Sequence, residues 1–165
     1  MPETLLENKT FDELQIGDSA TFEKSICEKD LILFAMSCGD FNPVHFDEAY
    51  AQSTKYGERI VHGMLLGAFV SAMIANQLPG PGSVYVSQSL NFKRPIKLGD
   101  SITIILTVIE KQEKGNRVIL ECVIKNQLRK ECVNGTAEVI APTQKLKISA
   151  YKPAVTNKLE ASFSD

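Results

Sequence analysis

The sequence predicts an α+β fold in which a mostly antiparallel sheet wraps around one long buried helix. The helix is predicted from an almost wholly apolar run at residues 64–78, which is too short for a membrane span of roughly 20 apolar residues. The strands are predicted from β-branched runs separated by short turns, a pattern typical of antiparallel sheets. Four such runs follow the helix and one precedes it: 83–92, 101–112, 117–126, 131–140 and 20–24.

The predicted central helix is apolar on nearly every side. A sheet covers only one side of a helix, so another surface must cover the opposite side. We expect a second copy of the chain to provide that surface.

Shorter elements are predicted before the central helix. A helix is expected over 28–36, with Ser25 and Glu28 as a capping box and Gly39 at its end. The stretch 40–45 contains Pro43 and is expected not to form regular helix. Asp47 is expected to cap a short helix that reaches about residue 53.

Composition excludes several classes of protein. The 165 residues carry 18 Lys and Arg against 20 Asp and Glu, a net charge of −2, without the basic excess of nucleic-acid-binding proteins. Four cysteines without a C-x-x-C pair, and only two histidines, argue against a structural zinc site. The N-terminal residues lack the pattern of a secretory signal. We therefore expect a cytoplasmic protein with reduced thiols and with neither nucleic-acid nor membrane partners.

The chain is expected to form one folded domain over residues 1–142. Residues 143–165 follow Pro142 and contain four lysines, Pro153 and scattered Ser and Thr. This composition predicts a poorly ordered tail or linker.

Asp40 and His45 are the candidate catalytic pair. They lie five residues apart around Pro43, and a turn there could bring the carboxylate and imidazole together to activate water. The alternative is an ordinary turn in which Asp40 and Asn42 cap backbone amides.

Other candidates lie at the central helix and beyond it. His62 could be a second base, or it could bond backbone near the helix start. Gly63 could expose N–H groups to a ligand with developing negative charge, or it could only allow close packing. Ser71 could line a site, or its hydroxyl could bond the carbonyl four residues earlier. Lys93 and Arg94 could meet phosphates or be solvated.

Several linked motifs resemble one family. The segment Phe34-x-x-Ser-Cys-Gly-Asp-Phe-Asn-Pro-Val-His45, with Ala51 following, resembles the signature of MaoC-like (R)-specific enoyl-CoA hydratases. Residues 60–66 resemble the start of their central helix, and residues 78–92 the next loop and strand. The resemblance covers roughly residues 11–142. It implies a hot-dog fold and a homodimer, or a higher homo-oligomer, with active sites at the subunit interface.

The resemblance also implies a reaction and residue roles. The reaction is reversible syn hydration of a trans-2-enoyl-CoA to an (R)-3-hydroxyacyl-CoA, which needs neither a cofactor nor a metal. Asp40 and His45 would be the catalytic dyad, and the backbone N–H of Gly63 would bind the thioester oxygen. Asn42 would position the loop and Ser71 would shape the site.

Three alternatives stay open on the sequence. The same fold also supports acyl-CoA thioesterases, and a non-catalytic acyl-CoA-binding module would need no dyad. Residues 7–18 and 138–143 resemble hydratase units that are fused to a phosphate acyltransferase domain. The chain is therefore expected to be either a free-standing relative or part of such a fusion.

Overall fold

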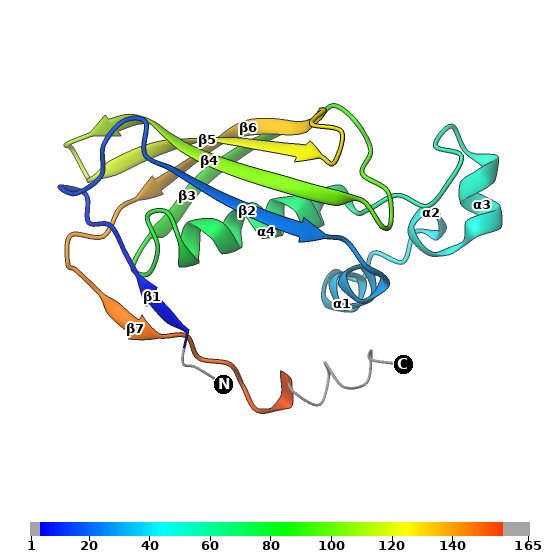
Figure 1. Cartoon of the computed structure of the whole chain (residues 1–165), viewed down its shortest axis with the longest axis horizontal. Coiled ribbons are helices and arrows are strands. Elements are labelled where there is room, and N and C mark those ends of the chain that lie inside the picture. The colour runs from blue at the N-terminus through cyan, green and yellow to red at the C-terminus, as the bar shows by residue number, and fades with distance from the viewer. Residues whose placement is uncertain (1–3, 157–165) are drawn as a thin grey trace.

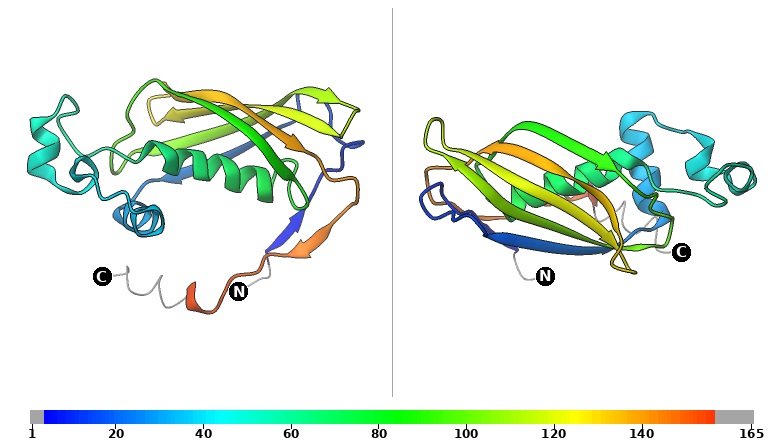
Figure 2. Two further views of the ribbon diagram at one scale, coloured as in Figure 1. Left: turned by 180° about the vertical axis from the view of Figure 1, so that it is seen from behind. Right: turned by 90° about the horizontal axis from the view of Figure 1, so that it is seen from above.

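A curved antiparallel sheet covers one side of a central helix, as predicted. The structure, a computed structural model, describes residues 4–156. The sheet has the strand order β2-β4-β5-β6-β3 and curves over helix α4, Gly63–Asn76 (Figures 1 and 2). Its strands are β2 (Ser19–Ser25), β3 (Val84–Phe92), β4 (Ser101–Gln112), β5 (Arg117–Asn126) and β6 (Glu131–Ile140). Within residues 4–156, no helix is long and apolar enough to cross a membrane.

The core lies between the sheet and α4. Alternate residues of β4 and β5 are buried, as expected for strands with one face on a core. These side chains pack with the buried side of α4 in one hydrophobic cluster. The outer side of α4 is different, because Met64 at its first turn is 61% exposed. The helix therefore buries only one of its two apolar sides within a single chain.

Strand β3 pairs with β6 rather than with β4, its neighbour along the chain. The segment 93–100 carries the chain past β5 and β6 to reach β4. Leu90 lies opposite Gly135 in the β3–β6 pair, and the two backbones approach so closely that a Cβ on Gly135 would lie 1.8 Å from the Ser89 carbonyl oxygen. Strand periodicity alone does not indicate this order, because it identifies strands but not their partners.

Helix α1 (Glu28–Cys38) begins where the sequence predicted but has a different cap. The N-cap is Cys27, and its N–H donates to Oδ2 of Asp30 at 2.9 Å. The expected pair of Ser25 and Glu28 is wrong, because Ser25 still belongs to β2 and its hydroxyl bonds Ser101. Gly39 ends α1 with a φ of 81°, a conformation that glycine adopts without strain.

Two short helices follow α1. Asp47 caps α3 (Glu48–Ser53) as predicted, by accepting from the N–H of Tyr50. The expectation that 40–45 contains no helix is wrong, because α2 spans Pro43–Phe46. Pro43 is the first helical residue, where the missing N–H would have no partner in any case. Helices α2 and α3 project from one end of the sheet (Figure 2).

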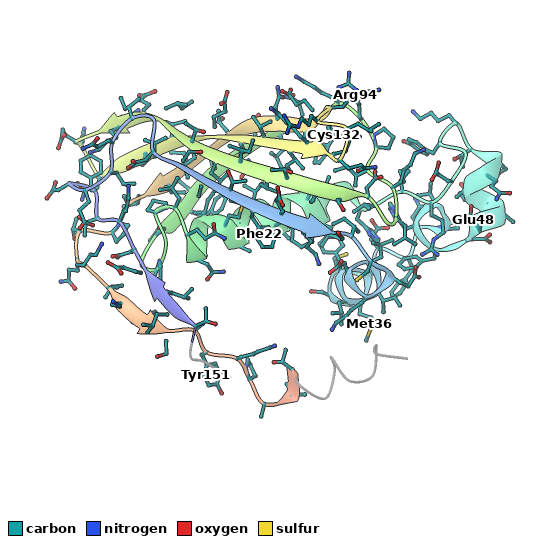
Figure 3. All side chains as sticks on the ribbon, in the orientation of Figure 1. Phe22, Met36, Glu48, Arg94, Cys132 and Tyr151 are labelled. Carbon is teal, nitrogen blue, oxygen red and sulfur yellow. The ribbon has the colours of Figure 1, made fainter. Side chains whose placement is uncertain are left out.

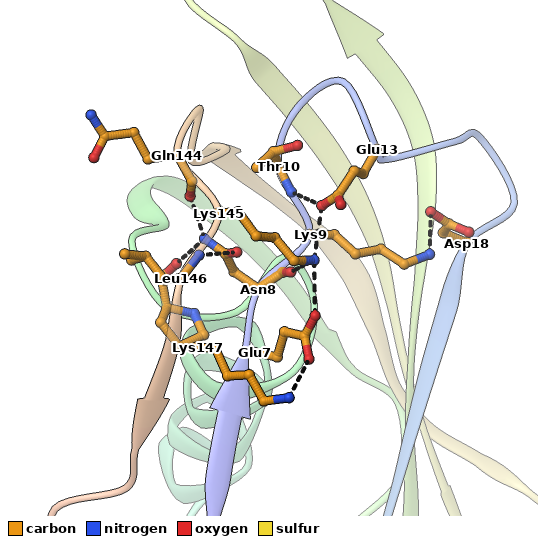
Figure 4. Close-up of polar contacts among 11 residues, drawn as sticks. Glu7, Asn8, Lys9, Thr10, Glu13, Asp18, Gln144, Lys145, Leu146 and Lys147 are labelled. Atoms are coloured by element: carbon orange, nitrogen blue, oxygen red, sulfur yellow. Dashed lines mark hydrogen bonds and ion pairs between the residues drawn. The ribbon is translucent and has the colours of Figure 1, made fainter.

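The two ends of the chain pair with each other. Strand β1 (Leu5–Glu7) and strand β7 (Lys147–Ser149) form a separate antiparallel pair on the α4 side of the molecule (Figure 1). Lys145 reaches Glu7 and Glu13 beside this pair (Figure 4). The start of the expected tail at residue 143 therefore corresponds to a paired segment, because β1 supplies partners that composition cannot indicate. Residues 157–165 lie outside the described part.

Candidate functional site

Asp40 and His45 lie side by side at the end of α1. The Oδ2 atom of Asp40 is 4.0 Å from Nε2 of His45. Asp40 sits in the turn that follows Gly39, whereas His45 belongs to α2. The side chain of His45 is 10% exposed and that of Asp40 is 49% exposed. The turn therefore brings the two groups together, as predicted, with the imidazole buried and the carboxylate accessible to solvent.

A backbone contact determines which nitrogen of His45 can act as a base. Nδ1 lies 2.8 Å from the carbonyl oxygen of Ile60. A carbonyl only accepts, so Nδ1 carries the proton in this contact, and in the neutral ring Nε2 holds the lone pair. Nε2 is the nitrogen that faces Asp40. Arg59 supports α2 from the same segment, because its Nε donates to the His45 carbonyl and its guanidinium pairs with Glu28.

Asn42 connects the two members of the pair. Its side-chain oxygen accepts from the N–H of Val44 at 3.1 Å and so caps α2. Its own N–H donates to Oδ1 of Asp40 at 3.2 Å. One residue therefore fixes the start of the helix that carries His45 and one oxygen of the Asp40 carboxylate.

The free atoms of the pair are arranged to hold a water molecule. Nε2 of His45 and Oδ2 of Asp40 are both acceptors, and their separation of 4.0 Å is too long for a direct hydrogen bond. One water oxygen about 2.8 Å from each atom would fit and would donate one O–H to each. The pair can therefore orient a water and accept its proton.

His62 lies directly behind His45. The two rings stack with centroids 3.7 Å apart and planes at 27°. Nε2 of His62 is 3.0 Å from the carbonyl oxygen of Asp40 and donates to it. His62 is 1% exposed, and this burial lowers its pKa below the ordinary 6.5, with the neighbouring His45 as a smaller cause in the same direction. Of the two roles left open for His62, this geometry favours the bond to backbone.

A metal ion does not suit this arrangement. Donor atoms of Asp40, His45 and His62 lie within 4.8 Å of one another. The two imidazoles are stacked nearly parallel, however, so their in-plane lone pairs run side by side rather than converging on a point about 2.0 Å from each nitrogen. The set is therefore arranged for proton chemistry with water.

Gly63 begins α4 immediately after His62 and lines a cavity of about 340 Å³. Its N–H is among the first of the helix, which have no partner within the helix. A Cβ at this position would lie 3.3 Å from the ring of Phe92. Ile60 also lines the cavity, and its carbonyl holds His45. Ile60 thus connects the cavity to His45, although neither Asp40 nor His45 lines it.

Basic side chains surround this cavity. Lys55, Lys93 and Arg94 belong to its lining. Lys93 pairs with Glu131, and Arg94 donates to the Glu131 carbonyl. Figure 3 places Arg94 next to Cys132 at the end of the sheet nearest α2 and α3. The lining of the cavity therefore carries positive charge that a phosphate could meet.

Ser71 lies away from the dyad within one chain. It is eight residues after Gly63 on α4, a rise of about 12 Å. Seven residues separate it from Met64, so both lie on the outer side of the helix. In the described part of the chain, Ser71 makes no hydrogen bond with Asp40, with His45 or with the Gly67 carbonyl. Its role in the site stays a prediction.

Two supports of the site were not predicted. The Ile60 carbonyl and the Arg59 guanidinium both position His45 from a segment about 15 residues further along the chain. A backbone acceptor leaves no signal in a sequence, and Arg59 resembles any surface arginine. Only the fold identifies them.

Known proteins match this chain over a range that includes the candidate site. The family model described as "MaoC like domain" matches residues 13–139. The chain is 40% identical over 136 residues to the (R)-specific enoyl-CoA hydratase of Rhodospirillum rubrum, over 81% of this chain and 92% of the relative. It is 38% identical to the (R)-specific enoyl-CoA hydratase of Aeromonas caviae, over 78% and 96% of the two chains.

A solved structure of an R-hydratase also matches this chain. The R-hydratase PhaJ1 of Pseudomonas aeruginosa, in the unliganded form, has a TM-score of 0.87 and 47% sequence identity, and the match covers 91% of this chain and 96% of that chain. The predicted resemblance and the predicted fold are therefore confirmed. The chain belongs to the family of MaoC-like hydratases and has the hot-dog fold.

Proposed function

We propose that this protein is an (R)-specific enoyl-CoA hydratase, which adds water reversibly to trans-2-enoyl-CoA to give (R)-3-hydroxyacyl-CoA. One observation carries the proposal: the lone pair of His45 and the carboxylate of Asp40 are spaced to hold a single water. The activity is the one named for the relatives from R. rubrum and A. caviae.

Residues of this chain supply each step of the addition. His45 Nε2, assisted by Asp40, accepts a proton as the water oxygen bonds to C3. The electrons of the C2–C3 double bond move toward the thioester, whose oxygen gains negative charge. The N–H of Gly63 at the start of α4 donates to that oxygen. The dyad then returns a proton to C2, so that the net change is addition of H and OH on one face.

The cavity beside Gly63 supports coenzyme A as the carrier of the acyl group. Coenzyme A is rich in phosphate, and Lys55 and Arg94 place positive charge in the lining of the cavity. The acyl thioester would then extend from these residues toward the dyad.

The test is an assay of the purified protein with trans-2-enoyl-CoAs of several chain lengths, with analysis of product stereochemistry. Hydration is followed by the loss of absorbance of the conjugated thioester. We expect Asp40→Asn and His45→Gln each to lower kcat by about 10²–10⁴-fold. Wild-type activity in either variant would contradict the dyad. Release of free thiol without hydration would instead indicate a thioesterase, and tight binding without turnover a binding module.

The proposed active form is a homodimer in the cytoplasm. Strand β3 is an edge strand with exposed Val84, Tyr85 and Val86, and such an edge can pair with a second chain. The outer side of α4, with Met64 and Ser71, would then face the partner. The free cysteines of the described part fit a reducing compartment. Val86→Asp should shift the mass measured by light scattering toward the monomer, and an unchanged mass would contradict this interface.

A further inference from the structure

His62 is the strongest candidate for a role that the proposed reaction does not yet use. It is one of only two histidines and is almost completely buried. Among the buried side-chain nitrogen and oxygen atoms of residues 4–156, only Nδ1 of His62 has no hydrogen-bond partner. A buried polar atom without a partner costs free energy, so the fold retains this imidazole at a cost to stability.

We propose that His62 is a positioning residue that sets the geometry of the dyad through two contacts. Its Nε2–H holds the Asp40 carbonyl at 3.0 Å, and its ring face supports the His45 ring at 3.7 Å. His62 therefore touches both members of the pair, Asp40 through its backbone and His45 through its ring. This proposal rests on the proposed hydratase function, because it concerns the same dyad.

The first contact fixes the backbone of Asp40. Asp40 follows the end of α1, so no helix hydrogen bond holds its carbonyl. His62 supplies a donor from the residue just before α4. Because α4 packs in the hydrophobic core, this bond ties the backbone of Asp40 to the packed part of the fold. A shift of about 1 Å at such a group can cost up to about a hundredfold in rate.

The second contact, the stacking of the two rings, holds the His45 ring in place and is compatible with a positive charge on it. Phe34 and Phe46 enclose His62 with ring centroids 5.2 and 5.7 Å away, so the imidazole cannot rotate freely. The titratable groups that face His62 are Asp40 and His45. When His45 accepts a proton, the His62 ring beside it is neutral, because burial lowers the pKa of His62. A second proton on His62 would instead place two positive charges in stacked rings.

Two substitutions of His62 each remove one of its two contacts and leave the other. His62→Gln keeps a donor near the position of Nε2 but removes the ring, whereas His62→Phe keeps a ring but removes the donor. We expect His62→Phe to lower kcat by about tenfold to a hundredfold with less than a threefold change in KM. We expect His62→Gln to recover a large part of that loss. Val118→Ala is the control for lost stability. It shortens a fully buried side chain at the start of β5, at the end of that strand away from the dyad.

A direct measurement of the tautomer complements the kinetics. In protein labelled with ¹⁵N-histidine, the two imidazoles are assigned by the signals that disappear in His62→Gln. We expect protonated Nε2 and unprotonated Nδ1 for His62, with the opposite pattern for His45, and titration of His62 below the range of a free imidazole.

Two results would overturn the proposal. These are an unprotonated Nε2 on His62, or wild-type kcat in His62→Phe at matched thermal stability. If the wild-type protein hydrates no enoyl-CoA, the proposed function fails. The tautomer measurement then still decides whether His62 holds the Asp40 carbonyl.

Discussion

Asn8 and Leu146 hydrogen bond to each other in both directions across the two ends of the chain. The Asn8 N–H donates to the Leu146 carbonyl at 3.2 Å, and the Leu146 N–H donates to Oδ1 of Asn8 at 2.9 Å. The Asn8 amide also donates to the carbonyls of Pro81 and Gln144 (Figure 4). One buried side chain thus joins the N-terminal segment, the loop after α4 and the segment before β7.

Replacing Asn8 should release these segments from one another. Asn8→Ala removes three hydrogen bonds and leaves buried backbone groups without partners, so we expect the free energy of unfolding to fall by about 2–3 kcal/mol. Denaturant unfolding measures the change. Gln144→Ala is the control, because only the backbone carbonyl of Gln144 takes part. Similar stability of the two variants would show that the amide contributes little.

Gly135 should tolerate no side chain. An added Cβ would lie 1.8 Å from the Ser89 carbonyl oxygen and 2.7 Å from its carbon, and both atoms belong to a neighbouring strand that cannot move without losing its pairing. Gly135→Ala should therefore cost more than about 4 kcal/mol or prevent folding. Soluble yield and thermal unfolding measure this effect. Thr136→Ala, an exposed neighbour on the same strand, should fold normally, and an equally stable Gly135→Ala would contradict the close approach.

Local pattern explains which parts of the fold were predictable. Strands β4, β5 and β6 have the bounds that the sequence predicted, because side chains alternate between core and outer face and short turns separate the runs. The place of β3 beside β6 depends on a long-range pairing that has no local signal. Strand β7 is only three residues long and exists because β1 lies beside it.

The candidate site likewise has residues that a local sequence pattern predicted and a contact that depends on the fold. Asp40, Asn42 and His45 were predictable because they lie within six residues of one another and each chemical type has a role in that turn. Gly63 was predictable from its place at a helix start. The contact between His62 and Asp40 spans 22 residues, so it arises only when α4 docks against the end of α1.

Asn42 should affect both stability and catalysis. Asn42→Ala removes the cap of α2, which is worth about 1 kcal/mol, and it frees the turn that holds Asp40 and His45. We expect kcat to fall with little change in KM, measured with the enoyl-CoA assay. Asn42→Ser retains a capping oxygen and should retain more of both properties. Equal activity in the Ala and Ser variants would indicate that capping does not position the dyad.

The stability of the protein should depend on pH through His62. Burial keeps the folded pKa of His62 below the ordinary value of 6.5, so below that pH the unfolded chain binds more protons than the folded chain. The free energy of unfolding should therefore decrease as pH falls from about 7 to about 5. His62→Phe lacks the group and should show a shallower decrease. Denaturant unfolding across this range measures the two slopes, and parallel slopes would mean that His62 binds a proton as readily in the folded chain as in the unfolded one.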